Sequence, residues 1–486
     1  MFSRIFDHSV EILTLGNAKK NGFSFALRSL NRIFAIGKDN YNRNILLERN
    51  FAITSDVGWL TLLHMLVDAV CACGVFMLMP DLQVTSVTML FFVYNALAFL
   101  TQPLVGLWLD RTTMTVFPYL PVATGLLLCG TLLGFGIVTS VLPAPPLLVA
   151  LLMGLGNSLF HVYGGKFVTE QTGNDARTLG LFVSTGALGV TLGSLFPSLW
   201  LWGTAMVCIG VLTLFFWKKI KDVSDMTISV QPLSIGKGFL LVALVMVLLV
   251  VFVRSFFGQL VPELGHGAIF YPILLCLLGF LGKATGGFVA CQFGMGRTLS
   301  VSLMLAGVCF LLGGRHAVFF LPMVFLLNLS MPVTLYWANG MLNNHVGLAF
   351  GLLAAMLVPG HALGMCGADS ETLRFLLNPL VATVILELLV LYGLSERRWQ
   401  MLAMSVVMNV LTNVPLNLFV AHAPICYTSL PWILALECLV VVVESLLFYL
   451  VTRDIRKAVT YGILCNVVSY LAGVLFQSIM FYFNFV

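Results

Sequence analysis

A histidine and an aspartate stand four residues apart in the apolar stretch LLHMLVDAV. On a helix, His64 and Asp68 would lie on the same face. An ionisable side chain at membrane depth costs from about 2.5 kcal/mol upward, so such residues are by default functional candidates. Histidine changes its charge near physiological pH and a carboxylate can accept a proton, so the pair could bind and release protons. We therefore predict a proton-coupling site that contains Asp68 and His64.

Two further side chains could take part in the same chemistry. His161 ends the stretch GLGNSLFH, and Arg254 lies within LLVVFVRSFFG. Arginine cannot lose its proton, so a buried Arg254 must find an acid, carbonyls, water or an anionic solute. Either it pairs with Asp68, directly or through water or solute, or it extends toward the outer membrane surface. Each histidine has an alternative role as a neutral imidazole hydrogen-bonded within the protein.

The composition places these residues in a membrane protein. Of the 486 residues, 59% are hydrophobic and 9% charged, and the mean hydropathy is +1.01. A water-soluble protein with this composition would expose far more apolar surface than its charges could solubilise. Apolar runs of about 20 residues, long enough to span a bilayer, follow one another from residue 57 onward. The chain is predicted to be an all-α polytopic membrane protein.

We predict fifteen membrane-spanning helices. They cover residues 57–79, 84–107, 115–140, 147–168, 178–200, 202–217, 238–261, 268–290, 298–314, 317–340, 347–367, 372–394, 399–422, 430–452 and 458–483. With the N-terminus inside, twenty of the 25 Lys and Arg residues fall on the cytoplasmic side. The positive-inside rule therefore predicts a protein of the cytoplasmic membrane with a cytoplasmic N-terminus.

The chain contains no pattern typical of a metal, cofactor or disulfide site. The eleven cysteines mostly lie within apolar runs and show no zinc-binding spacing. We predict no cofactor and no metal. Residues 1–56 are predicted to be a cytoplasmic tail, which either lies on the lipid surface as an amphipathic helix or is partly ordered.

Helices 1–6 and 7–12 form two predicted halves with a matching local feature. GLWLDRT follows the second helix, and the glycine-rich GGFVACQFGMGRT follows the eighth. Such matching positions in two six-helix halves are typical of a duplicated transporter. The predicted domains are residues 1–56 (tail), 57–217 (first half), 218–237 (cytoplasmic linker), 238–394 (second half) and 395–486 (an appended three-helix module).

Several ordered motifs resemble the major facilitator superfamily, and within it the fosmidomycin-resistance type of efflux protein. They are H-x-x-x-D of the first helix, GLGNSLFH of the fourth, LGLFVSTGALGVTLG of the fifth, VRS of the seventh and PVTL…NNHVGLAFGLLAAM around the tenth and eleventh. The resemblance covers roughly residues 55–395. It implies the twelve-helix major facilitator fold, followed here by about three additional C-terminal helices.

The resemblance also implies a gate at GLWLDRT, formed by Gly106, Asp110 and Arg111. In the family these positions close the cytoplasmic side. Asp110 would either lie near the N-terminal end of the third helix or reach a helix terminus across the loop, where the positive end of the helix dipole favours an acid. Arg111 could bond a carboxylate, a carbonyl or a lipid phosphate, or it could simply be a charge that sets topology.

The chain departs from the family at two other places. Cys291 and Gln292 replace an acidic and a basic residue, and Gly193 is followed by Ser194 where drug–proton antiporters usually have proline. His361 lies where the family usually has small apolar residues, which indicates a substrate-specific feature. We place it with Arg254 and Asp68 in the predicted substrate cavity.

The predicted function is a proton-coupled secondary active transporter that moves a small organic solute or drug across the cytoplasmic membrane by alternating access. Its partners would be the solute, protons and the lipid bilayer, with no nucleic acid. No nucleotide motif and no nucleophile–base spacing indicates an enzyme. The alternative is a non-transporting sensor or scaffold on a transporter fold, in which residues 395–486 bind a membrane partner. Polar residues of that module, such as Asn409, Glu444 and Asn466, would otherwise serve as interhelical glue.

Overall fold

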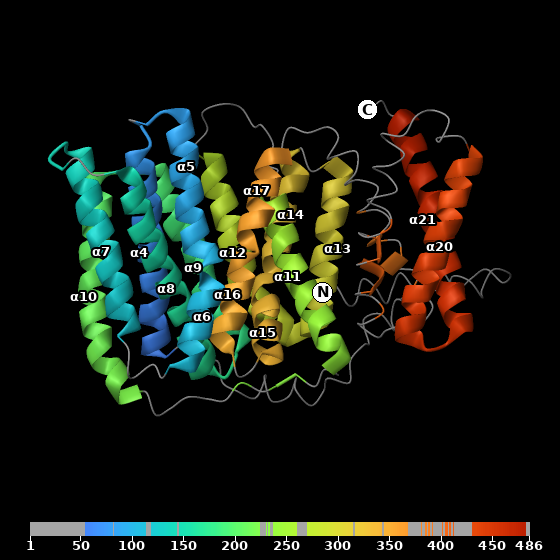
Figure 1. Cartoon of the computed structure of the whole chain (residues 1–486), viewed down its shortest axis with the longest axis horizontal. Coiled ribbons are helices and arrows are strands. Elements are labelled where there is room, and N and C mark those ends of the chain that lie inside the picture. The colour runs from blue at the N-terminus through green and yellow to red at the C-terminus, as the bar shows by residue number, and fades with distance from the viewer. Residues whose placement is uncertain are drawn as a thin grey trace, which may run out of the picture. The chain divides into compact units, whose positions relative to one another are not determined.

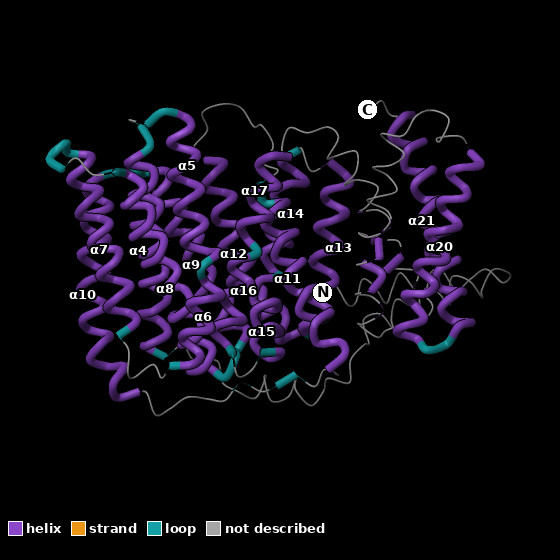
Figure 2. Tube along the Cα trace, viewed as in Figure 1, coloured by secondary structure: helices purple, strands orange, loops and turns teal. Residues whose placement is uncertain are grey.

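The structure is a computed structural model that describes residues 54–80, 82–112, 118–142, 145–223, 230, 232–233, 237–259, 270–313, 316–342, 345–367 and 430–482, with isolated positions between 381 and 412. Every regular element in these ranges is helical. The chain divides into two units, one of residues 42–381 and one that includes residues 382–486. The helices of the larger unit run side by side, as Figures 1 and 2 show.

The described helices of the larger unit are α4 (Ser55–Leu78), α5 (Val84–Asn95), the π-helix η1 (Ala96–Leu100), α6 (Gln102–Arg111), α7 (Tyr119–Val138), α8 (Pro146–Thr172), α9 (Ala176–Leu195), α10 (Leu199–Val223), α11 (Lys237–Phe257), α12 (Phe270–Phe293), α13 (Met295–Gly313), α14 (Ala317–Leu329), α15 (Met331–Met341), α16 (Val346–Ala355) and α17 (Leu357–Gly367). The smaller unit contains α20 (Leu430–Thr452) and α21 (Ile455–Tyr482).

Ten helical segments in the described ranges are long and apolar enough to cross a membrane, and Ala243–Phe257 is a shorter apolar helix. Together they match the first eleven predicted helices to within a few residues. The all-helical membrane fold is thus confirmed. Helices α20 and α21 match the last two predictions. The predicted helices at 372–394 and 399–422 lie largely outside the described residues, so the total of fifteen stays a prediction.

Two of the interrupted predicted helices, the second and the tenth, restart at a proline. The predicted second helix contains the π-helix Ala96–Leu100 before α6, which begins with proline in its first turn. The tenth divides into α14 and α15, and Pro332 stands at the start of α15. Proline lacks the backbone N–H that would continue the hydrogen-bond ladder, so a helix breaks or restarts there.

Glycines bring α9 against α4. Gly186, Gly189 and Gly193 recur at spacings of three and four, so they lie on one face of α9. A Cβ atom at Gly189 would collide with the carbonyl oxygen of Met65, and one at Gly193 with that of Ala69. Because no side chain stands between them, the two backbones touch over the segment of α4 that carries the predicted proton site.

Two helix pairs join the predicted halves in the same way. On α6, a Cβ at Gly106 would collide with the carbonyl of Gly347 on α16. On α12, a Cβ at Gly287 would collide with the carbonyl of Ala176 on α9. Both contacts are therefore backbone to backbone, a packing that small residues allow within membranes.

The smaller unit has its own polar interior. Asn466 on α21 donates a hydrogen bond to Glu444 on α20 at 2.6 Å, and the hydroxyl of Thr412 donates to the same carboxylate at 2.9 Å. Glu387 accepts hydrogen bonds from Ser405 and Asn409. These contacts support the interpretation of the polar residues as interhelical glue. Other predicted asparagines of this module lie outside the described residues.

The α4–α9 contact yields a stability prediction. Gly189→Ala should lower the thermal unfolding midpoint of the detergent-purified protein by several degrees, because overpacking a tight contact costs about 1–3 kcal/mol. The matched control is Gly210→Ala on α10, where a Cβ meets nothing within 4 Å. That change should leave the midpoint unchanged or raise it slightly, since alanine favours helix over glycine. Equal midpoints for the two variants would contradict the packing argument.

Candidate functional site

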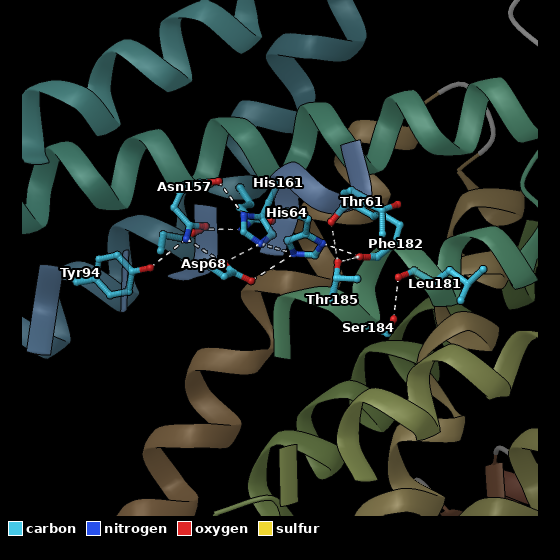
Figure 3. Close-up of polar contacts among 12 residues, drawn as sticks. Thr61, His64, Asp68, Tyr94, Asn157, His161, Leu181, Phe182, Ser184 and Thr185 are labelled. Carbon is cyan, nitrogen blue, oxygen red and sulfur yellow. Dashed lines mark hydrogen bonds and ion pairs between the residues drawn. The ribbon is translucent and has the colours of Figure 1, made fainter. Parts of the chain in front are cut away.

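Three buried ionisable side chains meet between α4 and α8. His64 and Asp68 come from α4, and His161 comes from α8. The Nε2 atoms of the two histidines are 2.9 Å apart. Asp68 Oδ2 lies 3.4 Å from His64 Nε2, and Oδ1 lies 3.4 Å from His161 Nε2. Figure 3 shows the three side chains converging; we call them the histidine–aspartate cluster.

Backbone carbonyls fix the orientation of both imidazole rings. His64 Nδ1 lies 2.7 Å from the carbonyl oxygen of Phe182 on α9, and His161 Nδ1 lies 3.0 Å from that of Asn157. A carbonyl oxygen can only accept, so each Nδ1 must carry the hydrogen that it donates. In neutral rings both Nε2 atoms are then unprotonated, and both point at the carboxylate. The cluster therefore places four acceptor atoms together, which calls for a cation or a proton among them.

Two more polar side chains surround Asp68. The amide of Asn157 donates to Asp68 Oδ1 at 3.4 Å and to the Tyr94 hydroxyl at 3.0 Å. On the other side, the backbone at Gly186 lies so close to Asp68 Oδ2 and His64 Nε2 that an added Cβ would collide with both atoms. A buried carboxylate with such partners is held in one position, and the cluster is thus preorganised.

Among the described residues Arg254 forms no direct ion pair with Asp68. Pairing through water or solute, and extension toward the outer membrane surface, stay predictions. Asp68 is committed to the two histidines, whereas Arg254 on α11 is buried and makes no ion pair or side-chain hydrogen bond within the described part of the chain. Lys283 on α12 lies within electrostatic range of Asp68, His161 and Arg254. It likewise has no hydrogen bond or ion pair to a described residue. Two cations thus lie near the cluster without an acid of their own.

Asp110 closes one end of the helix bundle. Its carboxylate accepts hydrogen bonds from the backbone N–H groups of Gly347 at 2.9 Å and Leu348 at 2.8 Å, in the first turn of α16. Lys166 on α8 donates to the same carboxylate at 2.9 Å and forms an ion pair with Glu170 at 2.9 Å. An acid at a helix N-terminus satisfies free N–H groups and the positive end of the dipole. We call this arrangement the Asp110 gate.

A second polar contact crosses the halves at the same end of α8. The amide of Asn339 on α15 donates to the Thr169 hydroxyl at 3.2 Å and to the Asn174 side-chain oxygen at 3.0 Å. Asn174 in turn donates to the carbonyl of Tyr336 at 2.9 Å. Together with the Asp110 gate, these bonds hold α8 and the loop after it against α15 and α16.

The other predicted site residues are more dispersed. Gly106 lies at the backbone contact with α16, next to the Asp110 gate. Arg111 is exposed and makes no hydrogen bond or ion pair to a described residue. This position agrees with its alternative role as a charge that sets the membrane topology. His361 on α17 packs against Phe91 with ring centroids 6.0 Å apart, and its buried Nε2 has no hydrogen-bond partner in the described ranges.

Sequence reasoning missed the roles of Asn157, Lys166 and Lys283. For Asn157 a signal was present, since it precedes His161 by four residues, the same spacing as His64 and Asp68. Lys166 binds Asp110 from a position four residues before Glu170 on the same helix. Lys283 lies among glycines of α12. Nothing local in the sequence indicates that it lies near helices α4 and α8.

No family model matches the chain, and no curated protein matches it. Solved structures resemble it at low identity. One is FucP, a major facilitator superfamily transporter in the outward conformation, with 14% identity, a TM-score of 0.47, and coverage of 74% of this chain and 98% of FucP. Another is a bacterial homologue of the iron transporter ferroportin in an outward-facing state, with 16% identity, a TM-score of 0.40 and the same coverage.

The Asp110 gate yields a prediction on backbone exchange. Asp110→Ala removes both acceptors from Gly347 and Leu348, and the loss of a helix cap costs about 0.5–2 kcal/mol. Hydrogen–deuterium exchange of these two amides should become about tenfold faster, since 1.4 kcal/mol is a factor of ten.

The matched control is Asp454→Ala, which removes a cap in the smaller unit. Asp454 accepts from the N–H groups of Arg456 and Lys457 within its own helix start. Its loss should affect exchange only in the first turn of α21. Unchanged exchange at residues 347–348 in Asp110→Ala would contradict the gate.

Proposed function

We propose that the chain is a secondary active transporter of the major facilitator type, which moves a small organic solute or drug across the cytoplasmic membrane. In this proposal the two six-helix halves, residues 57–217 and 238–394, rock against each other so that a central site opens to each side in turn. Protons are the coupling ion. The motifs of the first, fourth, fifth and eleventh helices support the assignment, and the two solved structures above are both named as transporters.

The Asp110 gate is the observation that carries this proposal. A carboxylate from the first half is bonded to two N–H groups at the start of a helix of the second half. These bonds exist only while the halves touch, and water can replace them when the halves separate. A contact of this kind suits a state that must be stable yet reversible. The concentration of Lys and Arg in the loops on this side supports a cytoplasmic position for the gate.

The packing of the halves supports the same reading. In a six-plus-six repeat the second helix corresponds to the eighth and the fifth to the eleventh. The α6–α16 contact then corresponds to the α12–α9 contact, and both are made through glycine. Two equivalent contacts about a pseudo-twofold axis would let one half pivot on the other.

The histidine–aspartate cluster is the proposed coupling site. One proton between the two Nε2 atoms would turn four mutually repelling acceptors into a hydrogen-bonded, electrically neutral group with Asp68. When that proton leaves, the charge of Asp68 is no longer balanced within the cluster. Arg254 and Lys283 of the second half are the cations that it would then attract, so proton release would change how strongly the halves hold together.

The proposed solute region includes Arg254, Asp68 and His361, to which the structure adds Lys283 as a neighbour of Asp68. Arg254 and Lys283 are cations without an acidic partner in the described residues. A buried positive charge of this kind favours a solute with a carboxylate or another acceptor-rich group. The direction of transport proposed is efflux in exchange for protons.

The alternative of a non-transporting sensor or scaffold assigns the smaller unit to partner binding. Glu444 accepts hydrogen bonds from Thr412 and Asn466, and Glu387 accepts one from Ser405, all within that unit. These bonds favour a structural role for its polar residues. Absence of solute flux in proteoliposomes, together with a stable partner on purification, would favour the alternative over transport.

The coupling proposal is tested with Asp68→Asn. A thermal-shift screen of the purified protein first identifies a solute that stabilises it. Proteoliposomes with an imposed pH gradient then report accumulation of that solute. Asp68→Asn should abolish gradient-driven accumulation, because the amide cannot exchange a proton with the histidines. Glu437→Gln, the same chemical change in the smaller unit, should transport normally. Unchanged solute accumulation in Asp68→Asn would contradict a role of Asp68 in proton coupling.

A further inference from the structure

The histidine–aspartate cluster has the ligand geometry of a metal site. A tetrahedral metal ion with bonds of about 2.0–2.1 Å holds its ligand atoms about 3.3–3.4 Å apart. The Nε2 atoms of His64 and His161 and the oxygens of Asp68 are separated by 2.9, 3.4 and 3.4 Å. The two 3.4 Å distances go to different oxygens of Asp68, and the ligand atoms all lie within 4.8 Å of one another. A small rotation of the carboxylate and a slight separation of the imidazoles would therefore bring one oxygen and both nitrogens to tetrahedral spacing. The sequence predicts no such site, because the ligands come from helices 97 residues apart.

The surroundings of the ligands are those that a metal site needs. Metal-binding histidines usually donate their other ring N–H to a carbonyl or carboxylate, which fixes the ring and leaves the ligand nitrogen unprotonated. His64 does so to Phe182, and His161 does so to Asn157. Asn157 also holds Asp68 through its amide. Figure 3 shows these second contacts on the far side of each ligand.

Gly186 brings the backbone of a third helix, α9, close to the ligands. An added Cβ at this position would collide with Asp68 Oδ2 and lie 2.8 Å from His64 Nε2. Any residue other than glycine would thus displace two of the three ligand side chains from their present positions.

We propose that His64, Asp68 and His161 bind one divalent transition-metal ion, with Zn²⁺ and Co²⁺ as the best-fitting ions. Two imidazoles and one carboxylate favour such ions over Mg²⁺ and Ca²⁺, which take oxygen ligands. Three protein ligands leave the fourth tetrahedral position open. Metal binding at these three residues does not require transport, so the two are tested independently.

Nearby charge determines what fills the fourth position. The ion and the Asp68 carboxylate together carry one positive charge, and Lys283 and Arg254 add two more cations in the vicinity. An anion as the fourth ligand reduces this repulsion. A chloride ion, a hydroxide or the carboxylate of a solute meets that requirement. A proton between the histidines and a metal ion occupy the same volume, so the two exclude each other.

Co²⁺ is the probe that tests the site, because its visible absorption is strong in tetrahedral and weak in octahedral coordination. The full chain, purified in detergent and stripped with a chelator, is titrated with Co²⁺ in chloride buffer. We expect a tetrahedral spectrum that saturates at about one ion per chain and disappears when Zn²⁺ is added. His64→Gln and His161→Gln should each weaken binding at least about tenfold. His316→Gln, at an exposed histidine of another helix end, should bind as the unaltered protein does.

Two further measurements keep the test decisive if a histidine variant does not fold. Gly186→Ala keeps all three ligands but presses a methyl group against Asp68 Oδ2 and His64 Nε2, so it should reduce the tetrahedral absorption. Zn²⁺, but not Mg²⁺, should raise the unfolding temperature of the unaltered protein, since a ligand of the folded state stabilises it. The proposal is overturned if the unaltered protein shows no tetrahedral Co²⁺ spectrum, or if that spectrum persists in a folded His64→Gln or His161→Gln variant.

Discussion

Polar groups inside a bilayer can be satisfied only by the protein itself, and the arrangement of this helix bundle follows from that requirement. The histidine–aspartate cluster shows this requirement most clearly. Asp68 is surrounded by two imidazoles and an amide, and both imidazoles are anchored to backbone carbonyls. Each of these partners comes from a different turn of α4, α8 or α9. The three helices must therefore keep one register relative to one another, or several buried groups lose their partners together.

Glycine makes that register possible. The close approach of α9 to α4 places the Phe182 carbonyl within reach of His64 and packs the α9 backbone against Asp68. The same device joins α6 to α16 and α9 to α12, where backbones touch across the predicted halves. Without a hydrophobic driving force between helices in lipid, close van der Waals packing supplies the attraction, and small residues permit it. The chemistry of the cluster and the packing of the bundle thus have a common origin.

The described polar contacts fall into two kinds. Those of the cluster lie within the first predicted half and are fully buried, whereas those of the Asp110 gate and of Asn339 join the two halves near the helix ends. A contact near a helix end can exchange protein partners for water at small cost, while a contact at membrane depth cannot. In the proposed transport cycle, opening would therefore occur at the Asp110 gate, whereas the cluster would keep a fixed geometry. Arg254 and Lys283 belong to neither group, because these two cations of the second half have no acidic partner among the described residues.

The sequence alone determined the helical membrane fold, because apolar runs of bilayer length are a local property that hydropathy reads directly. It also identified His64, Asp68 and His161 as residues too costly to bury without a purpose, and it indicated that Asp110 reaches a helix terminus. Helix interruptions at residues 96–100 and 330 were not predicted, since the hydropathy there is continuous. The sequence also could not show which buried charged side chains contact one another. Only the tertiary structure assigned Asp68 to two histidines rather than to Arg254, and Lys166 to Asp110. The physical reason is that periodicity fixes the face of a helix on which a residue lies, whereas its partner depends on the rotation and depth of the neighbouring helices, which long-range packing decides.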